Sequence, residues 1–240
     1  MAQYDEIDCL LYDQQRQSET FLPERQTIRS LVGNVADINV LDLACGSGIY
    51  TRMIKQAGAA RVIGVDISSK MLAVARQKES SRTIGVEYIQ ANVTKMPSLG
   101  KFHLITAIWL FNYATTRAEL NSMFSKAAKN LGRNGRIVAL TLHPDFTLSD
   151  TGWEGWNTRN LTEAKLGNCS RYTHTYSSAE LSFYQWSREA YEDALKRSGF
   201  ASISWHEIEI SKNLLTGPNA TQWANFAKNP PLICLSATAT

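Results

Sequence analysis

The chain has 240 residues, 44% of them hydrophobic, and a net charge of +3 from 25 basic and 22 acidic side chains. This length and composition fit one domain, residues 1–240, and exclude a disordered or fibrous chain. Because the small positive charge comes without a basic cluster, we expect neither nucleic acid nor an anionic membrane surface as the main partner.

The first residues carry Asp5, Glu6 and Asp8 without a basic segment, and no apolar run approaches the roughly 18 residues that span a bilayer. We therefore expect a cytoplasmic protein with no membrane association. The 4 cysteines and 4 histidines show none of the spacings of a zinc site, so we expect no metal.

Strands and helices alternate along most of the chain. Residues 4–32 predict one or two helices interrupted at Pro23, and residues 1–35 are expected to form an N-terminal helical cover. Seven apolar segments predict strands, at 40–43, 61–65, 86–90, 104–108, 136–142, 203–210 and 232–237. Helices are predicted at 49–57, after Ser68, at 116–131 and at 187–198. This alternation predicts an α/β fold with a mostly parallel sheet and helices on both faces.

A long excursion, residues 144–186, separates the fifth strand from its helix. Within it, residues 172–176 and 181–186 predict two short aromatic strands, which we interpret as a hairpin. Long connections inside a compact domain are usually functional. Because this one starts at the carboxyl end of a strand, where open parallel sheets bind ligands, we expect it to form a lid on the substrate side.

The segment VLDLACGSG places Asp42 in the first strand and Gly46, Ser47 and Gly48 in the turn that follows. Asp66 ends the second strand. Glycines let a ligand approach the backbone at a helix N-terminus, and an acid after the second strand can accept both ribose hydroxyls. The pattern therefore predicts a nucleoside ligand, although Thr51 stands where a dinucleotide site usually has a third glycine.

The segments VLDLACGSGIYTR and VIGVDIS resemble motifs one and two of the class I S-adenosylmethionine-dependent methyltransferases. The resemblance covers roughly residues 40–142. It implies a Rossmann-like sheet of seven strands whose last strand, LICLSA, is antiparallel. It also implies S-adenosylmethionine as the methyl donor and S-adenosylhomocysteine as the product.

Through this resemblance, the glycine turn would hold the methionine end of the cofactor, Asp66 the ribose, and the carbonyl of Asn92 the adenine amine. Tyr12 would fold over the cofactor as an N-terminal tyrosine often does in the family. The expected cofactor-binding residues are Tyr12, Asp42, Ala44, Gly46, Ser47, Gly48, Asp66, Ile67, Met71, Asn92, Val93 and Trp109.

The acceptor side is predicted from position along the chain. Trp109, Asn112 and Tyr113 follow the fourth strand, and His143 ends the fifth strand, where it is the candidate general base. Tyr113 is the second candidate catalytic residue. The expected substrate-binding residues are Tyr12, Trp109, Asn112, Tyr113, His143, Trp153, Trp156 and Tyr184.

The segments SREAYEDALKRSGF and NPPLICLSA are similar to the C-terminal half of toxoflavin-type natural-product N-methyltransferases. This weaker resemblance implies a small-molecule acceptor. We therefore expect in-line methyl transfer to a nitrogen or oxygen of a small metabolite. Two alternatives remain: an NAD-dependent oxidoreductase, which Thr51 and an antiparallel last strand disfavour, and a non-catalytic S-adenosylmethionine-binding protein. The acceptor, the methylated atom and the oligomeric state stay open.

Overall fold

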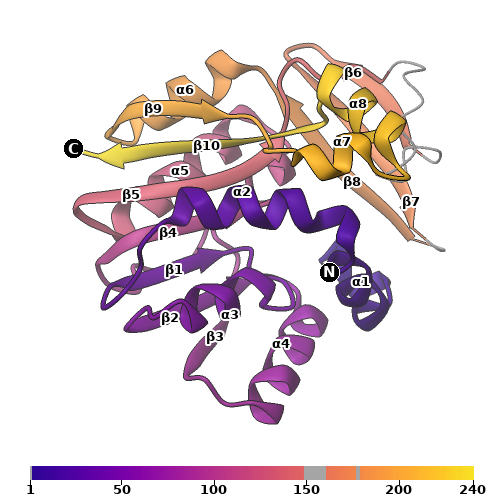
Figure 1. Cartoon of the computed structure of the whole chain (residues 1–240). Helices are drawn as coiled ribbons and strands as arrows, with labels where there is room; N and C mark the ends of the chain where they lie inside the picture. The colour runs from indigo at the N-terminus through magenta and orange to yellow at the C-terminus, as the bar shows by residue number, and fades with distance from the viewer. Residues whose placement is uncertain (1, 149–160, 177–178) are drawn as a thin grey trace.

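The computed structural model describes residues 2–148, 161–176 and 179–240. A seven-stranded sheet in the order β3-β2-β1-β4-β5-β10-β9 runs through the middle of the molecule (Figure 1). Its strands are β1 Asn39–Leu43, β2 Arg61–Asp66, β3 Val86–Gln90, β4 Phe102–Ile108, β5 Leu131–Leu142, β9 Phe200–His206 and β10 Leu232–Ala239. Only β10 is antiparallel to its neighbours, β5 and β9. The predicted fold, including its antiparallel last strand, is confirmed.

The strand order reverses between β1 and β4, which pair in parallel at the centre of the sheet. In open α/β sheets the loops beyond such a reversal diverge and leave a crevice at the carboxyl ends of the strands. The loops after β1, β2, β3 and β4 lie at this crevice and carry most of the predicted cofactor residues.

Helices cover both faces of the sheet. They are α3 Ile49–Gln56, α4 Ser69–Ser81, α5 Arg117–Asn130, α6 Arg188–Arg197, α7 Lys212–Thr216 and α8 Ala220–Lys228. The predicted caps form: the hydroxyls of Ser68 and Thr116 accept hydrogen bonds from backbone N–H groups in the first turns of α4 and α5. One face packs against α5 and α6, and the other against α3, α8 and the N-terminal helix α2.

The N-terminal segment forms η1 Gln3–Glu6, α1 Cys9–Arg16, η2 Glu19–Phe21 and α2 Leu22–Val32. We predicted that Pro23 interrupts a helix, and this was wrong: Pro23 lies in the first turn of α2. Proline is tolerated there because the first N–H groups of a helix have no partner within the helix. No helix among the described residues combines the length and the apolar character that crossing a membrane requires.

The excursion after β5 forms a separate antiparallel sheet of β6 Leu161–Leu166, β7 Cys169–Tyr176 and β8 Ala179–Trp186. The predicted β7–β8 hairpin is present, whereas β6 was missed because LTEAKL has no buried residue and mixes charges with apolar residues. The strand expected at 203–210 ends at His206, and α7 and α8 were not predicted. In Figure 1, α1 and the small sheet both lie at the end toward which the parallel strands point.

Candidate functional site

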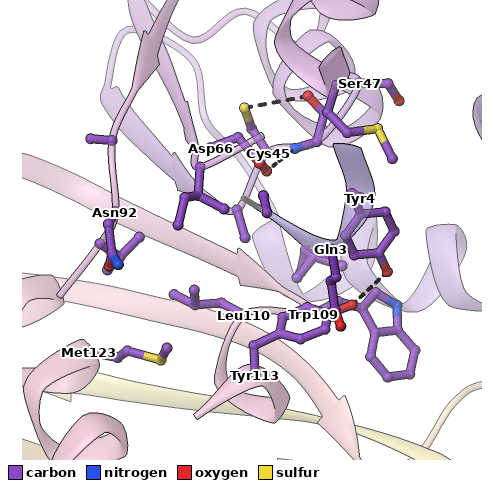
Figure 2. Close-up of a pocket in the computed structure, with 18 of the residues that line it drawn as sticks. Gln3, Tyr4, Cys45, Ser47, Asp66, Asn92, Trp109, Leu110, Tyr113 and Met123 are labelled. Atoms are coloured by element: carbon purple, nitrogen blue, oxygen red, sulfur yellow. Dashed lines mark hydrogen bonds between the residues drawn. The ribbon is translucent and has the colours of Figure 1, made fainter. Parts of the chain in front are cut away.

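A cavity of about 440 Å³ lies at the carboxyl ends of the central strands, between the sheet, the N-terminal segment and β8. Figure 2 shows the glycine turn and Asp66 at one end, and Leu110, Tyr113 and Met123 at the other. Its described wall contains Ala2, Gln3, Tyr4, Tyr12, Arg16, Ala44, Cys45, Gly46, Ser47, Ile49, Tyr50, Asp66, Ile67, Met71, Ala91, Asn92, Val93, Ile108, Trp109, Leu110, Tyr113, Thr115, Glu119, Met123, Ser182 and Tyr184. This volume is typical of pockets for small ligands.

The glycine turn joins β1 to α3. Both glycines have positive φ angles, 54° at Gly46 and 79° at Gly48. Residues that carry a side chain rarely adopt such angles. A Cβ atom on Gly46 would meet nothing within 4 Å, whereas one on Gly48 would lie 2.3 Å from the Tyr88 hydroxyl. The two glycines therefore differ: Gly46 leaves free space at the cavity, and Gly48 lets α3 pack against β3.

Asp66 connects the end of β2 to this turn. One carboxylate oxygen accepts a hydrogen bond of 2.7 Å from the N–H of Gly46, and the other accepts one of 2.8 Å from the N–H of Ser68. Burial raises the pKa of Asp66, although these two hydrogen bonds oppose the rise. Because a carboxylate can accept about four hydrogen bonds, Asp66 can still accept from a ligand hydroxyl.

Beside Asp66, Ile67, Met71 and Val93 form an apolar part of the wall. The carbonyl oxygen of Asn92 accepts hydrogen bonds from the N–H and the hydroxyl of Thr94, at 2.9 and 2.8 Å. Both bonds come from Thr94, two residues further along the chain, and Asn92 itself lines the cavity, so its contact with the adenine amine stays a prediction.

Helix α1 closes the cavity above the glycine turn. The Ser47 hydroxyl donates to the buried carboxylate of Asp13 at 2.5 Å, and the Lys78 ammonium of α4 also donates to that carboxylate. Arg16, one turn further along α1, lines the cavity and forms an ion pair with Glu24, which also accepts from the Tyr50 hydroxyl. Sequence reasoning missed Asp13 and Arg16, and their spacing of three residues on a predicted helix beside Tyr12 was the available signal.

Aromatic side chains form the wall farther from Asp66. The hydroxyls of Tyr4 and Tyr113 lie 2.6 Å apart, and the two rings pack edge to face. Tyr12 packs edge to face on Tyr4, with ring centres 5.3 Å apart. Trp109 directly follows β4 and has a positive φ of 63°, which is unusual for a bulky residue and is common at functional sites.

The cavity wall contains most of the predicted site residues. It brings together Tyr12, Ala44, Gly46, Ser47, Asp66, Ile67, Met71, Asn92, Val93, Trp109, Tyr113 and Tyr184. Trp153 and Trp156 lie outside the described residues. Sequence reasoning did not predict Gln3, Tyr4, Arg16, Tyr50, Glu119, Met123 and Ser182, which come from the cover, from helices and from β8.

Four predicted residues do not line the described wall of the cavity, and we correct those expectations. Asp42 is buried in the sheet, where its carboxylate accepts from the Thr51 and Thr106 hydroxyls at 2.6 and 2.7 Å. Gly48 packs against β3, as described above, and Asn112 is fully buried in η3, Phe111–Tyr113. The fourth residue is His143.

His143 faces a separate hollow formed by residues after β9, the end of α8 and the entry to β10. Its Nδ1 atom accepts from the N–H of Asp145 at 3.1 Å, and its Nε2 atom lies 3.3 Å from Glu207. These contacts fix the ring outside the cavity, so the structure does not place His143 as a base for an acceptor bound there.

Residues 40–135 match a protein family described as a methyltransferase domain. A demethylmenaquinone methyltransferase of Thermus thermophilus is 33% identical over 108 residues, which cover 44% of this chain and 47% of that protein. The chain spans about half the length, or less, of the curated relatives that it matches at 30% identity or more.

Solved structures show the same fold. An S-adenosylmethionine-dependent methyltransferase from Mesorhizobium loti superposes with a TM-score of 0.67 at 22% identity, covering 90% of this chain and 97% of that one. Magnesium protoporphyrin IX methyltransferase from Synechocystis PCC 6803, with S-adenosylmethionine bound, superposes with a TM-score of 0.60 at 18% identity, covering 95% and 91%.

Proposed function

Because this chain carries a class I S-adenosylmethionine-dependent methyltransferase fold and domain, we propose that it transfers a methyl group from S-adenosylmethionine to a nitrogen or oxygen of a small metabolite. The proposal rests on one observation: a single cavity has the glycine turn and Asp66 at one end and a wall of aromatic side chains at the other.

The cavity wall has the chemistry that this cofactor requires. Gly46 leaves space for a ligand against the backbone, and the carboxylate of Asp66 can still accept a hydrogen bond from the ribose. The apolar surface of Ile67, Met71 and Val93 suits the adenine ring. Arg16 brings a guanidinium to the end of the cavity that contains Ser47, so we assign it to the methionine carboxylate.

When bound, the cofactor supplies a methyl group on a positively charged sulfur, and an acceptor lone pair displaces it in line while the sulfur keeps the electrons of the broken bond. The residues of this chain hold the acceptor in position and exclude water, which can contribute on the order of 7 kcal/mol. The aromatic faces of Tyr12 and Trp109 favour a nearby positive charge. Any proton that the methylated acceptor still carries is released to bulk water once the product leaves the cavity.

A small acceptor is favoured by the way the cavity is covered. The N-terminal segment lies over it from one side, and β8 contributes Ser182 and Tyr184 from another. Hydrogen bonds join the N-terminal segment to the small sheet. Gln3 bonds to Ser182 of β8, and Tyr176 of β7 bonds to Gln15 of α1. A compact metabolite fits beneath such joined covers, whereas a macromolecule would require them to separate. The closer likeness to toxoflavin-type N-methyltransferases stays a prediction.

Two measurements test the proposal. Thermal shift and calorimetry should show that S-adenosylmethionine and S-adenosylhomocysteine stabilise and bind the protein, whereas NAD does not; binding of NAD alone would contradict the assigned cofactor. Incubation with S-adenosylmethionine and a broad metabolite library should then give a product heavier by one added methylene. If the cofactor binds and no product forms from any metabolite, the chain is a non-catalytic cofactor-binding protein.

A further inference from the structure

We propose that Tyr4 and Tyr113 together form a hydrogen-bond donor that orients the acceptor through a ring nitrogen or carbonyl oxygen beside the methylated atom. The acceptor would thus be a planar ring compound with such a lone pair. This inference rests on the proposed function and names the class of compound that the cavity takes.

The two hydroxyls come from opposite sides of the cavity. Tyr4 belongs to η1 in the N-terminal segment, and Tyr113 belongs to η3 after β4, 109 residues away. Their oxygens lie 2.6 Å apart, and Figure 2 shows them meeting beside Trp109, away from Asp66. A ligand whose nucleoside part lies at Asp66 would leave this region of the cavity to the acceptor.

Counting hydrogens shows why the pair is a donor. Two phenols bring two hydrogens, and the bond between them uses one, so the second can point to a ligand. If the Tyr12 hydroxyl also hydrogen-bonds to this pair, one hydrogen still remains for a ligand, because each added phenol brings one hydrogen and uses one. A ligand atom that takes up this hydrogen must supply a lone pair.

The surroundings keep these phenols protonated. Burial raises the pKa of Tyr4 well above its ordinary value, and the neighbouring phenols of Tyr113 and Tyr12 add to the rise. Burial raises the pKa of Tyr113 in the same way. The pair thus orients the acceptor as a neutral donor and does not remove its proton.

Gln3 is the positioning residue for this pair. Its side-chain amide donates to the carbonyl of Ser182 at 3.2 Å and accepts from the N–H of Ser182 at 3.0 Å. Through these two bonds the Gln3 side chain pairs with the backbone of β8 and holds the N-terminal segment against that strand. Because Tyr4 is the next residue, the docking fixes its hydroxyl against Tyr113.

The test uses two probes of equal shape, quinoline and naphthalene, on the protein saturated with S-adenosylhomocysteine. Only quinoline offers a ring nitrogen. Ligand-observed NMR should show that the wild type prefers quinoline by about fivefold, the worth of one hydrogen bond. Tyr4→Phe or Tyr113→Phe alone leaves one phenol with one hydrogen, so each should keep part of the preference. The double variant Tyr4→Phe/Tyr113→Phe should bring this ratio close to one.

Tyr176→Phe is the matched control. It removes a hydroxyl from the same aromatic cluster, but that hydroxyl bonds to Gln15, and Tyr176 is not part of the cavity wall. This variant should keep the wild-type ratio. For the positioning role, Gln3→Met should weaken the preference, whereas Gln3→Glu, which still accepts from Ser182, should weaken it less. Affinity for S-adenosylhomocysteine should stay within about twofold in all six variants.

The outcomes separate this inference from the function on which it rests. No preference for quinoline in the wild type, or an unchanged preference in the double variant Tyr4→Phe/Tyr113→Phe, overturns the inference. An equal loss in Tyr176→Phe also overturns it, because a general loosening of the cover would then be the cause. Failure of S-adenosylhomocysteine to bind the wild type contradicts the proposed function instead.

Discussion

The carboxylate of Asp66 accepts a hydrogen bond of 2.7 Å from the backbone N–H of Gly46, 20 residues earlier in the chain. Through this bond, the acid at the end of β2 holds the glycine turn after β1, and its second oxygen holds the N–H of Ser68 ahead of α4. One side chain therefore fixes two loops of the cavity, in addition to the ribose contact that we propose for it.

Replacing Asp66 tests both roles. We expect Asp66→Ala to weaken S-adenosylhomocysteine binding by about tenfold or more, because the ribose hydroxyls lose an acceptor. The free energy of unfolding should also fall, by about 1–3 kcal/mol, because two backbone N–H groups lose their partner. Calorimetry and urea unfolding measure the two effects. Glu87→Ala, which removes an exposed carboxylate from the adjacent strand, is the control. Unchanged affinity in Asp66→Ala would rule out the ribose assignment.

The two glycines of the turn should respond differently to alanine. Gly48→Ala combines a positive φ with a Cβ 2.3 Å from the Tyr88 hydroxyl, so we expect a loss of roughly 2–4 kcal/mol in stability. Gly46→Ala has the strained φ but free space, so about 1 kcal/mol is expected. Because Gly46 lines the cavity, its variant should still lose affinity for S-adenosylhomocysteine.

Thermal unfolding and calorimetry on the two glycine variants check this order. Adding Tyr88→Phe to Gly48→Ala should recover part of the lost stability, since the hydroxyl is the nearest atom to the new Cβ. Equal stability losses in Gly46→Ala and Gly48→Ala would contradict the packing argument.

Asp13 should hold the N-terminal cover on the glycine turn. Asp13→Asn removes the charge that pairs with Lys78 and weakens the bond from Ser47. We expect a loss of about 1–3 kcal/mol in stability and faster trypsin cleavage after Arg16 and Arg25. Asp8→Asn on the same helix is the control, because asparagine caps a helix as well as aspartate does. Similar cleavage rates in both variants would show that Asp13 is not the anchor.

Asp42 should make the stability depend on pH. Burial raises its pKa from 3.8 to about 6, although the bonds from Thr51 and Thr106 oppose the rise. The folded state therefore binds the carboxyl proton of Asp42 more tightly than the unfolded state does. For this reason the contribution of Asp42 to stability is most favourable below about pH 4. It is lost as the pH rises to about 6, and the loss is of the order of 3 kcal/mol.

Comparing the wild type with Asp42→Asn isolates this effect from those of the other acids. The variant has no charge to bury and can still bond to both threonines. Its stability relative to the wild type should therefore increase between about pH 4 and 6, as measured by urea unfolding at each pH. A difference that stays constant across this range would contradict the raised pKa.

The sequence alone determined the sheet and the cofactor end of the cavity. Apolar strands alternating with capped helices predict a parallel sheet, because each element must bury one side. The glycine turn and Asp66 were recognisable because they lie next to strand ends, and the carboxyl ends of neighbouring parallel strands meet at one edge.

Only the tertiary structure decided which residues cover that edge. Gln3, Tyr4 and Arg16 reach the cavity because the N-terminal segment docks on β8 and α4, and no local pattern encodes a contact between residues 3 and 182. His143 was predicted as a site residue from its place at a strand end. Its contacts with Asp145 and Glu207 instead hold its side chain toward a separate hollow. Local periodicity fixes which elements form, whereas the direction of a side chain at a strand end depends on packing between distant segments.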